Sequence, residues 1–424
     1  MANQQAQDLF EDLEFLGDDE LISLAMGAPG KEALSGCTEI MMTATESAMS
    51  DLTQEKYVFQ YGPRQGDPGF LEHLAKFLSV QYGDNNISKD NLMVTAGATH
   101  GLHLTATVLF KEDIPVFVED PTYFIAIKML GKDLGRTVIP VPVGDDGIDV
   151  DKLEEMLKKH RHKAGDKSTW KCPFWTMLYL MTVYNNPRGN CPSPEKCNRL
   201  VELARKYDVL LFTEDVYNLL HFEEGNPPPR LLSYDVSDDP EYLGCVLSNG
   251  TFSKIFAPGL RLGWIEGRPG VVRLIMTSNT AWSGGSFNHY TSRVVSAALQ
   301  TGLLSQHLTK LCSVYRERMN LLCQALLKYL PAGCHFKQPK GGFFAWITLP
   351  DTVDGEALLS LANGKHKVNF ITGQSTSPTG SFKNCIRLSI SFADTNQIDA
   401  GVERLCKAIK EYTLNVANSE SSCS

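Results

Sequence analysis

Short apolar runs alternate with amphipathic stretches through the first two thirds of the chain. The apolar runs have the length of buried strands, and they are Leu92–Val94, Val116–Glu119, Phe174–Val183, Val209–Thr213 and Val246–Ser248. Stretches with helical periodicity lie between them, for example His100–Phe110 and Ser193–Lys206. This alternation predicts an α/β fold with a mainly parallel sheet, in which ligands bind at the carboxyl ends of the strands.

The pattern changes near Leu304. Longer helical stretches follow, then strand-like segments at Phe343–Leu349 and Ile386–Ser391, and then a closing helix to about Lys410. These elements predict a second, smaller α+β domain. We therefore divide the chain into an N-terminal arm (1–50) that packs with the small domain, a large domain (51–305) and a small C-terminal domain (306–424).

Composition and charge narrow the class of protein. At 424 residues, with 43% hydrophobic and 21% charged residues, the chain can bury the cores of two domains. Its net charge of −9 argues against a general nucleic-acid binder, and the basic run 158–171 is expected to be a solvated loop. No apolar stretch approaches the roughly 18 residues that span a membrane. We expect neither nucleic acid nor a membrane as a partner.

The start of the chain and the cysteines bear on its location. Residues 1–20 are polar and increasingly acidic, without the basic or apolar segments of a secretory or mitochondrial leader. The 11 cysteines are scattered, and the nearest pair, Cys191 and Cys197, lacks the spacing of a zinc ribbon. We expect a cytoplasmic protein with reduced thiols and no bound metal.

The segment Ser248–Trp264 carries the most specific chemistry. Lys254 is flanked by apolar residues, lies beside the hydroxyls of Thr251 and Ser253, and stands seven residues before Arg261. An amine that is desolvated or placed near another cation has a lowered pKa and can hold a carbonyl compound as a Schiff base. Hydroxyls and an arginine fork suit a phosphate monoester. The segment therefore offers an aldehyde anchor and a phosphate anchor, which pyridoxal 5'-phosphate requires.

Polar and aromatic residues follow the other predicted strands. The turn with Gly97, Ala98 and Thr99 opens a helix whose amides could hold an anion, although such turns serve tight packing equally often. Tyr123 could stack on a pyridine ring or belong to the core. Asn186 could donate to a phenolate oxygen, or it could simply form the Asn-Pro turn in which it stands.

Two charged residues adjoin or lie within apolar segments. Asp215 follows a strand, where its carboxylate could keep a pyridine nitrogen protonated; the alternative is an acidic residue on a solvated loop. Arg387 lies inside a strand-like segment, where it could bind a substrate carboxylate or form an internal salt bridge.

Taken in order, these motifs resemble those of a known family. The matching stretches cover almost the whole chain and are Gly27–Pro29, Tyr61–Gly62 with Gly66, Gly97–Thr99, Asp120–Tyr123, Asn186–Gly189, Asp215–Tyr217, Thr251–Lys254, Arg261–Gly263, Gly341–Phe344 and Arg387–Leu388. The chain resembles pyridoxal-phosphate-dependent aminotransferases of fold type I, class I/II, a group that includes 2-aminoadipate, kynurenine and aspartate aminotransferases. The resemblance implies a large domain with a mainly parallel mixed sheet flanked by helices and a smaller α+β domain.

The resemblance also implies roles around the cofactor ring. Lys254 would form the Schiff base, Asp215 would pair with the pyridinium and Tyr123 would stack on the ring. Asn186 and Tyr217 would bond the phenolate oxygen.

Further implied roles concern the phosphate and the substrate. The phosphate would be held by Gly97, Ala98, Thr99, Thr251, Ser253 and Arg261. Tyr61 would reach the phosphate of a neighbouring subunit, which implies a homodimer with sites at its interface. Arg387 would take the substrate α-carboxylate, in a pocket that Gly27 and Asn186 also line.

The chain departs from the family pattern in three places. Relatives usually place the tyrosine three residues after the pyridinium aspartate, but Tyr217 follows Asp215 by two. Counting from Glu214 restores the spacing and makes a glutamate the ring partner, an alternative that we favour less than Asp215. Thr182 replaces a usual proline, and Arg188 replaces a usual threonine.

The function implied is ping-pong transamination between an L-amino acid and a 2-oxo acid, with Lys254 as the proton carrier. An alternative on the same scaffold is a β-lyase acting on cysteine conjugates, or an enzyme with both activities. A more remote alternative is a non-catalytic regulator that binds pyridoxal phosphate. The fold does not fix the substrate, and the resemblance suggests an acidic or aromatic amino acid.

Overall fold

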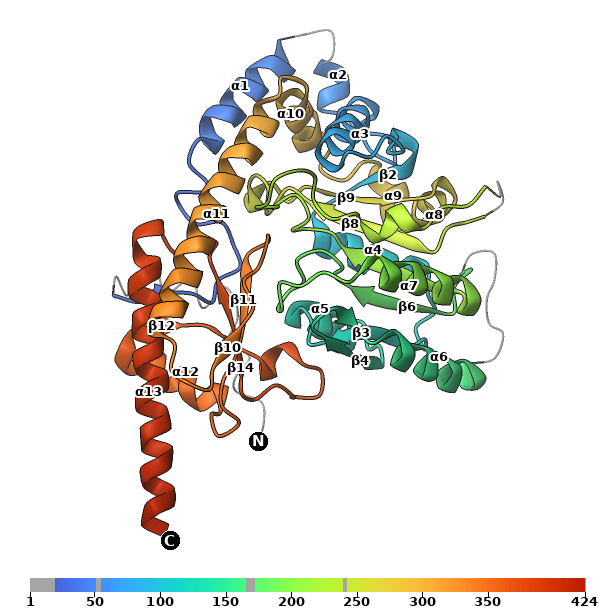
Figure 1. Ribbon diagram of the computed structural model, residues 1–424. Coiled ribbons are helices and arrows are strands. Elements are labelled where there is room, and N and C mark those ends of the chain that lie inside the picture. Colours follow the sequence, from blue (N-terminus) through green and yellow to red (C-terminus); the bar gives the residue numbers. More distant parts are fainter. Residues whose placement is uncertain (1–19, 51–54, 165–171, 239–241, 424) are drawn as a thin grey trace.

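The computed structural model describes residues 20–50, 55–164, 172–238 and 242–423. The first 19 residues, on which the expected lack of a leader mainly rests, lie outside the described residues, as do residues 165–171 of the basic run. Figure 1 shows a layered body of strands and helices beside a smaller body that contains both the long helix α11 (Leu303–Tyr329) and the C-terminal helix.

The layered body is built on an eight-stranded sheet with the order β2-β9-β8-β7-β6-β3-β4-β5. The strands are β2 (Leu92–Thr95), β3 (Val116–Asp120), β4 (Val138–Gly144), β5 (Gly147–Ile148), β6 (Thr176–Leu180), β7 (Val209–Glu214), β8 (Val246–Thr251) and β9 (Gly263–Gly267). Neighbours from β8 to β4 run parallel, whereas β2, β9 and β5 pair antiparallel. This arrangement confirms the predicted α/β fold with a mainly parallel mixed sheet.

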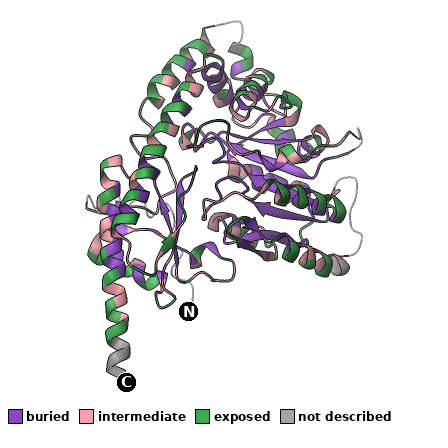
Figure 2. Ribbon diagram, viewed as in Figure 1, coloured by how far each residue is buried: buried purple, intermediate pink, exposed green. Residues whose placement is uncertain are grey.

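Helices cover both faces of this sheet, so the central strands are buried while the outer helix faces are exposed (Figure 2). The helices of this body are α2 (Glu55–Val58), α3 (Pro68–Tyr82), α4 (Ala98–Val108), α5 (Phe124–Lys128), α6 (Val150–Ala164), α7 (Pro194–Tyr207), α8 (Pro269–Ile275), α9 (Asn279–Gly284) and α10 (His289–Gln300). Single-turn helices lie at Lys89–Asn91, Met129–Asp133, Leu231–Tyr234, Pro258–Leu260, Gln374–Thr376 and Thr395–Gln397.

Local sequence explains where these helices begin and end. Helix α7 starts after Ser193, whose hydroxyl accepts a bond from the Lys196 amide, and Pro194 fits the first turn because it has no N–H to satisfy. It ends at Asp208, which adopts the left-handed conformation with φ 52°. Asp67 caps α3 in the same way, by accepting a bond from the Phe70 amide.

Two predicted elements differ from the structure in length. The apolar run Phe174–Val183 is a strand only over Thr176–Leu180, because its pairing with β7 ends at Leu180 and the rest leaves the sheet while staying buried. The closing helix runs as α13 (Ile398–Cys423), well beyond Lys410. The apolar pattern stops at Ile409 because burial stops there, but the helical backbone continues into solvent (Figure 1).

The smaller body has a four-stranded antiparallel sheet covered by helices. Its strands follow the order β10 (His335–Phe336), β11 (Phe344–Thr348), β14 (Cys385–Ser389) and β13 (Ile371–Thr372). Helix α13 packs against α11 and α12 (Gly355–His366). This is the α+β arrangement that the sequence predicts for the C-terminal part.

The first described residues touch both bodies. Strand β1 (Ile22–Ser23) pairs in parallel with β12 (Val368–Asn369) of the smaller body. Helix α1 (Cys37–Met49) then packs along α10 of the larger one. The stretch between these elements passes across the junction of the two bodies, where the site described below lies. The domain boundaries set from the sequence remain predictions.

Two buried arginines form ion pairs that connect segments of the large sheet and of the arm. Arg230, which is 2% exposed, donates to both carboxylate oxygens of Glu266 in β9 and stacks on Tyr82. Arg318 of α11 donates to Glu32 of the arm. Buried charges are tolerated only when they are paired in this way. Within the described part of the chain, no helix is both long and apolar enough to cross a membrane.

Candidate active site

A cavity of about 420 Å³ lies where the carboxyl ends of β3, β6, β7 and β8 face β11 and β14 of the smaller body. Arm residues 26–29 form another part of its wall. The residues predicted from the sequence that line it are Gly27, Ala98, Thr99, Tyr123, Asn186, Tyr217, Thr251, Ser253, Lys254, Arg261 and Arg387. Segments more than 350 residues apart in the chain therefore meet at one cavity.

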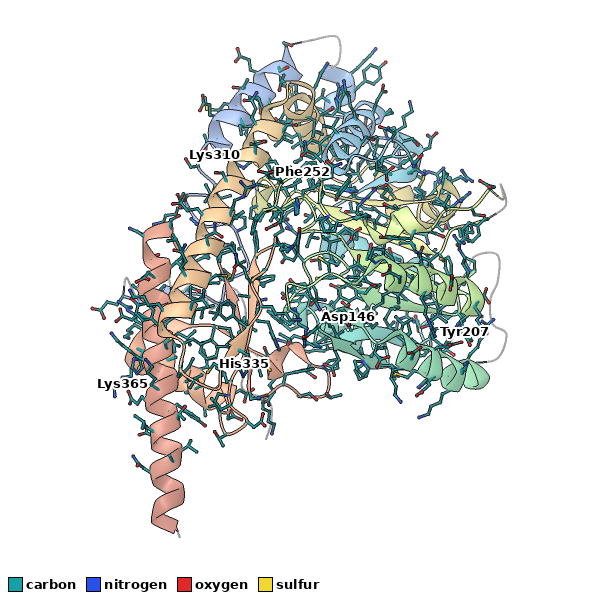
Figure 3. All side chains as sticks on the ribbon, in the orientation of Figure 1. Asp146, Tyr207, Phe252, Lys310, His335 and Lys365 are labelled. Atoms are coloured by element: carbon teal, nitrogen blue, oxygen red, sulfur yellow. The ribbon has the colours of Figure 1, made fainter. Side chains whose placement is uncertain are left out.

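Lys254 stands in the turn that follows β8. Its Nζ donates to the carbonyl oxygen of Gly27 at 2.8 Å, which joins the arm to the large sheet. Burial, reinforced by the nearby cations Arg387 and Arg261, lowers the pKa of Lys254 to about 8. Phe252, labelled in Figure 3, anchors the turn by packing on Phe70 and Trp264. The amine is therefore held in place and is easier to deprotonate than an ordinary lysine.

Hydroxyl groups and one arginine gather beside this lysine. The Thr251 hydroxyl donates to Ser253 Oγ at 3.0 Å and accepts from the Ser253 amide at 3.1 Å. Arg261 Nη1 approaches Ser253 Oγ at 3.5 Å. Within the described chain no carboxylate forms an ion pair with Arg261. A cation, two hydroxyls and a helix N-terminus together suit a phosphate group.

The helix N-terminus belongs to α4, and glycine is required at its start. Gly97 has φ 87°, and a Cβ there would lie 2.8 Å from Arg261 Nη2. A Cβ on Gly263 would lie 2.9 Å from the Cα of Gly97. Both glycines let the backbone of the turn approach its neighbours closely, so Ala98 and Thr99 reach the cavity from the first turn of α4.

Two tyrosines line the middle of the cavity. Tyr123 follows β3, and Tyr217 lies three residues after the end of β7. Burial raises the pKa of both phenols above the usual range, so both are neutral donors at physiological pH. The Tyr217 ring packs at a tilt against Phe343 and edge-on against Phe344.

The two acidic residues at the end of β7 have different positions. Glu214 lines the cavity, whereas Asp215 does not. Asp215 accepts hydrogen bonds from the hydroxyls of Thr213 at 3.0 Å and Ser248 at 2.5 Å. Its Oδ1 is buried without a hydrogen-bond partner among the described residues, so the pairing of Asp215 with the ring stays a prediction. The cavity carries Glu214.

Arg387 of β14 is buried at the opposite wall. Its Nη1 donates to Asn186 Oδ1 at 3.0 Å, its Nη2 donates to the carbonyl of Ala25 at 2.5 Å, and its guanidinium lies 4.1 Å from the centre of the Phe344 ring. Its Nε has no hydrogen-bond partner among the described residues. Burial lowers the pKa of Arg387 to about 10. The internal salt bridge considered from the sequence is absent from the described residues, so this cation is available for an anionic ligand.

Tyr61 lies outside the cavity. It is 79% exposed and lines a separate hollow with Arg64 and Trp282. Sequence reasoning also missed the apolar wall, which comprises Met26, Leu102, Phe124, Ile125, Met129, Met181, Val216 and Phe392. These residues carry no chemical signature, because apolar side chains at these spacings are expected in any core.

Comparisons with known proteins agree with this geometry. A sequence profile described as aminotransferase class I and II matches residues 19–405. The chain belongs to this family.

The relatives of this aminotransferase cover nearly its whole length. Aromatic-amino-acid aminotransferase 1 from Thermococcus litoralis is 29% identical, over 96% of this chain and 92% of the relative. The crystal structure of the multiple substrate aminotransferase from Thermococcus profundus has a TM-score of 0.83 at 27% identity, and the match covers 97% of each chain. The Pyrococcus horikoshii kynurenine aminotransferase has a TM-score of 0.81 at 30% identity, over 96% of this chain and 95% of the other.

These similarities identify the protein as a pyridoxal-phosphate-dependent aminotransferase of fold type I. It transfers amino groups between amino acids and 2-oxo acids. The names of these relatives support transamination, and they favour neither the β-lyase nor the regulator considered from the sequence.

Proposed function

We propose that Lys254 is the residue that bonds the cofactor and carries the proton in a ping-pong transamination, and that the amino donor has an apolar or aromatic side chain. The observation that carries the proposal is the position of a desolvated lysine in one cavity with an anion cradle and a buried arginine that no described carboxylate pairs. The lysine would bond the cofactor aldehyde, the cradle would bind the cofactor phosphate, and the arginine would bind the substrate carboxylate.

The residues fit pyridoxal phosphate. The cradle of Thr251, Ser253, Arg261 and the N-terminus of α4 would hold its phosphate, because glycine at Gly97 leaves the backbone room to approach an anion. Tyr123 would face the ring, and Tyr217 and Asn186 would bond its phenolate oxygen. When bound, the cofactor supplies an aldehyde for the amino group and a ring that accepts the electron pair of the broken Cα–H bond.

Arg387 would hold the α-carboxylate of the substrate. Its guanidinium is fixed by Asn186, Ala25 and Phe344, and it is partnered by no described carboxylate. An arginine fixed in this way binds a carboxylate with two hydrogen bonds and so sets the orientation of the Cα–H bond.

Lys254 would then move the proton. With a pKa near 8, its amine is partly neutral at the pH of a cell and can accept a proton from the substrate Cα. The Gly27 carbonyl, 2.8 Å from Nζ, would stabilise the resulting ammonium group until Nζ releases the proton again.

The side chain of the donor would meet the apolar wall. Among the described residues that line the cavity, the cations are Lys254, Arg261 and Arg387, and the proposal assigns each of them to the aldehyde, the phosphate or the α-carboxylate. A second substrate carboxylate would therefore be buried beside methionine, leucine and phenylalanine side chains without a partner, which costs several kcal/mol. The relatives named for aromatic amino acids and kynurenine are in line with this preference, whereas those named for 2-aminoadipate take a dicarboxylic amino acid.

We also propose that the protein is a homodimer and works in the cytosol. Exposed aromatic side chains gather near the hollow that Tyr61 lines, and they are Tyr57, Phe59, Tyr61, Trp282 and Tyr290. A second copy of the chain would cover this patch, since exposed apolar surface of this kind marks contact sites. The free thiols among the described cysteines support a reducing compartment.

Two measurements test the proposal. Lys254→Ala should abolish turnover with every donor, whereas Lys340→Ala, an exposed lysine outside the cavity, should leave turnover unchanged. A panel of single amino acids should bleach the visible absorbance of the cofactor-loaded enzyme, with neutral aromatic and aliphatic donors at least roughly 10-fold faster than aspartate or glutamate. Turnover without Lys254 would overturn its role, and a preference for dicarboxylic donors would overturn the assigned substrate class.

A further inference from the structure

Glu119 carries a buried carboxyl group that has no part in the reaction as described so far. It lies one residue before the end of β3, is only 3% exposed, and is not among the residues that line the cavity. No described lysine or arginine forms an ion pair with it. Burying a carboxyl group without a cation costs free energy, which an apolar side chain at this strand position would not. The contribution of Glu119 must therefore lie in the groups that it binds.

Two hydrogen bonds join Glu119 to the segment between β6 and the Asn-Pro turn. Its Oε2 accepts from the Met181 backbone N–H at 2.8 Å and from Asn185 Nδ2 at 2.9 Å. Met181 is the first residue after β6, and it forms part of the cavity wall. One oxygen atom on β3 therefore fixes the place where the neighbouring strand ends and the place where the turn begins.

The turn itself is built on the two residues that Glu119 holds. The backbone N–H of Asn186 donates to Met181 Sδ at 3.3 Å. The backbone N–H of Arg188 donates to Asn185 Oδ1 at 3.2 Å. A shift of Met181 or Asn185 would therefore shift the turn and Asn186 with it.

Asn186 is the point at which this network reaches the reacting groups. Its Oδ1 accepts from Arg387 Nη1 at 3.0 Å, so its Nδ2 is left as the donor on the side of the cavity. In the proposed function, Asn186 bonds the phenolate oxygen of the cofactor, and Arg387 binds the substrate carboxylate. A displacement of the turn would disturb both contacts, and an error of about 1 Å in such a position can cost roughly 100-fold in rate.

We propose that Glu119 is a positioning residue for transamination. By holding Met181 and Asn185, it sets the place of the turn, and the turn sets the place of Asn186 and of the arginine that Asn186 bonds. The inference rests on the proposed function, which assigns Asn186 to the cofactor. Burial raises the pKa of Glu119 to about 8, so the carboxyl group is mostly protonated at neutral pH. Because a single oxygen accepts both bonds, the amide of a glutamine could replace it without a change of charge.

The test compares Glu119→Leu, which removes the acceptor, with Glu119→Gln, which keeps it. In Glu119→Leu, kcat/KM for the amino donor should fall roughly 10- to 100-fold. The pH midpoint of the visible absorbance of the bound cofactor should rise by about half a unit or more. It rises because the phenolate oxygen loses the bond from Asn186 and then holds the proton on the Lys254 nitrogen more tightly. Glu119→Gln should keep both values close to those of the parent.

Asn185→Ala tests the same connection from its other end. It removes one of the two bonds to Glu119 and leaves the carboxyl group in place. Both readouts should move in the same direction as in Glu119→Leu. The double variant should show less than the sum of the two single effects, because the two residues act through one contact. This variant decides the question if Glu119→Leu does not fold, and parent values of both readouts in Asn185→Ala would then overturn the inference.

Asp235→Asn is the matched control for a loss of stability. Asp235 is also a buried carboxylate that accepts from backbone N–H groups, those of Cys245 and Val246, but it lies at the amino end of β8, away from the cavity. This variant should lower the melting temperature without moving either readout. A shift in it as large as that in Glu119→Leu would show that general loosening moves the readouts, and would overturn the inference.

The remaining outcomes separate the two proposals. Borohydride reduction should fix the cofactor to Lys254 in the parent, and a parent without that label refutes the proposed function itself. With the label present, a folded Glu119→Leu that keeps both parent values overturns the role of Glu119 alone. A loss in Glu119→Gln as large as that in Glu119→Leu also overturns it, because the hydrogen-bond acceptor would then not be the cause.

Discussion

Replacing Arg387 by lysine should weaken the amino-donor reaction without weakening cofactor binding. Arginine offers a fork of donors, whereas lysine offers a point charge. In the structure, Nη1 and Nη2 already bond Asn186 and Ala25, and Nε remains without a described partner. A lysine at this site can keep one charged contact to a carboxylate but cannot keep a second one in a fixed plane.

The loss can be estimated from that difference. One hydrogen bond to a charged group contributes about 1.5–3 kcal/mol, which corresponds to a roughly 10- to 150-fold fall in kcat/KM. Most of the fall should appear in KM, since the carboxylate is held before and during the reaction. The affinity for pyridoxal phosphate should change little, because Arg387 lies on the wall opposite the cradle of Thr251 and Ser253.

The assay is a single turnover followed by the visible absorbance of the bound cofactor. The parent and Arg387→Lys are each mixed with an amino acid and with the corresponding amine, which lacks the carboxylate. The amine should react equally fast with both proteins. Arg188→Lys is the matched control, because Arg188 follows Asn186 closely but pairs with Asp145 away from the cavity. Equal losses for the amine and the amino acid would refute the role of Arg387 as a carboxylate clamp.

Three further predictions concern protonation, stability and the cradle. Incorporation of pyridoxal phosphate into the cofactor-free protein should accelerate as pH rises, with a midpoint near 8, because only neutral Lys254 attacks the aldehyde; a midpoint near the ordinary value of about 10.4 would contradict the desolvation argument. Glu266→Gln should lower the free energy of unfolding by up to about 3 kcal/mol in urea denaturation, because it removes the nearer of the two carboxylates that pair with the buried Arg230 and leaves Asp84 at 3.5 Å. The double variant Arg230→Met with Glu266→Leu should recover most of that loss, since it removes both buried charges together, and an unchanged midpoint in the single variant would contradict the prediction. Gly97→Ala should weaken cofactor binding at least roughly 10-fold in equilibrium titrations, because a φ of 87° is strained for alanine and a Cβ would displace the Arg261 guanidinium from the cradle. An affinity equal to that of the parent would contradict this prediction.

Much of the fold was predictable because the buried strands leave a direct pattern in the sequence. The runs at Val116 and Val209 are apolar throughout, as strands covered on both faces must be. The location of the functional residues was predictable for the same reason. Once the strands are placed, Lys254 and Asn186, which follow two of them, must lie at one edge of the sheet. The pairing of distant segments around the cavity then follows from the order of the strands.

The choice between Glu214 and Asp215 could not be made in this way. A shift of one residue along a strand reverses the face to which a side chain points, and sequence patterns place strand ends only to within a few residues. The apolar wall, including Phe124 and Met181, could not be predicted either, because the residues that pack against a ligand and the residues that pack in a core are equally apolar. The length of α13 was underestimated because the fully buried apolar positions that mark the helix in the sequence end at Ile409.

The arm has a consequence for how this enzyme could be redesigned. Its backbone is bonded to the smaller body by the β1–β12 pairing and by the bond from the Ser389 amide to the Leu24 carbonyl. At these points the arm is attached through main-chain groups, which do not depend on the identity of its side chains. Met26 and Ala28 contribute side chains to the cavity from this stretch. A library of substitutions at these two positions would vary the donor pocket while leaving the arm anchored and Lys254 in contact with the Gly27 carbonyl.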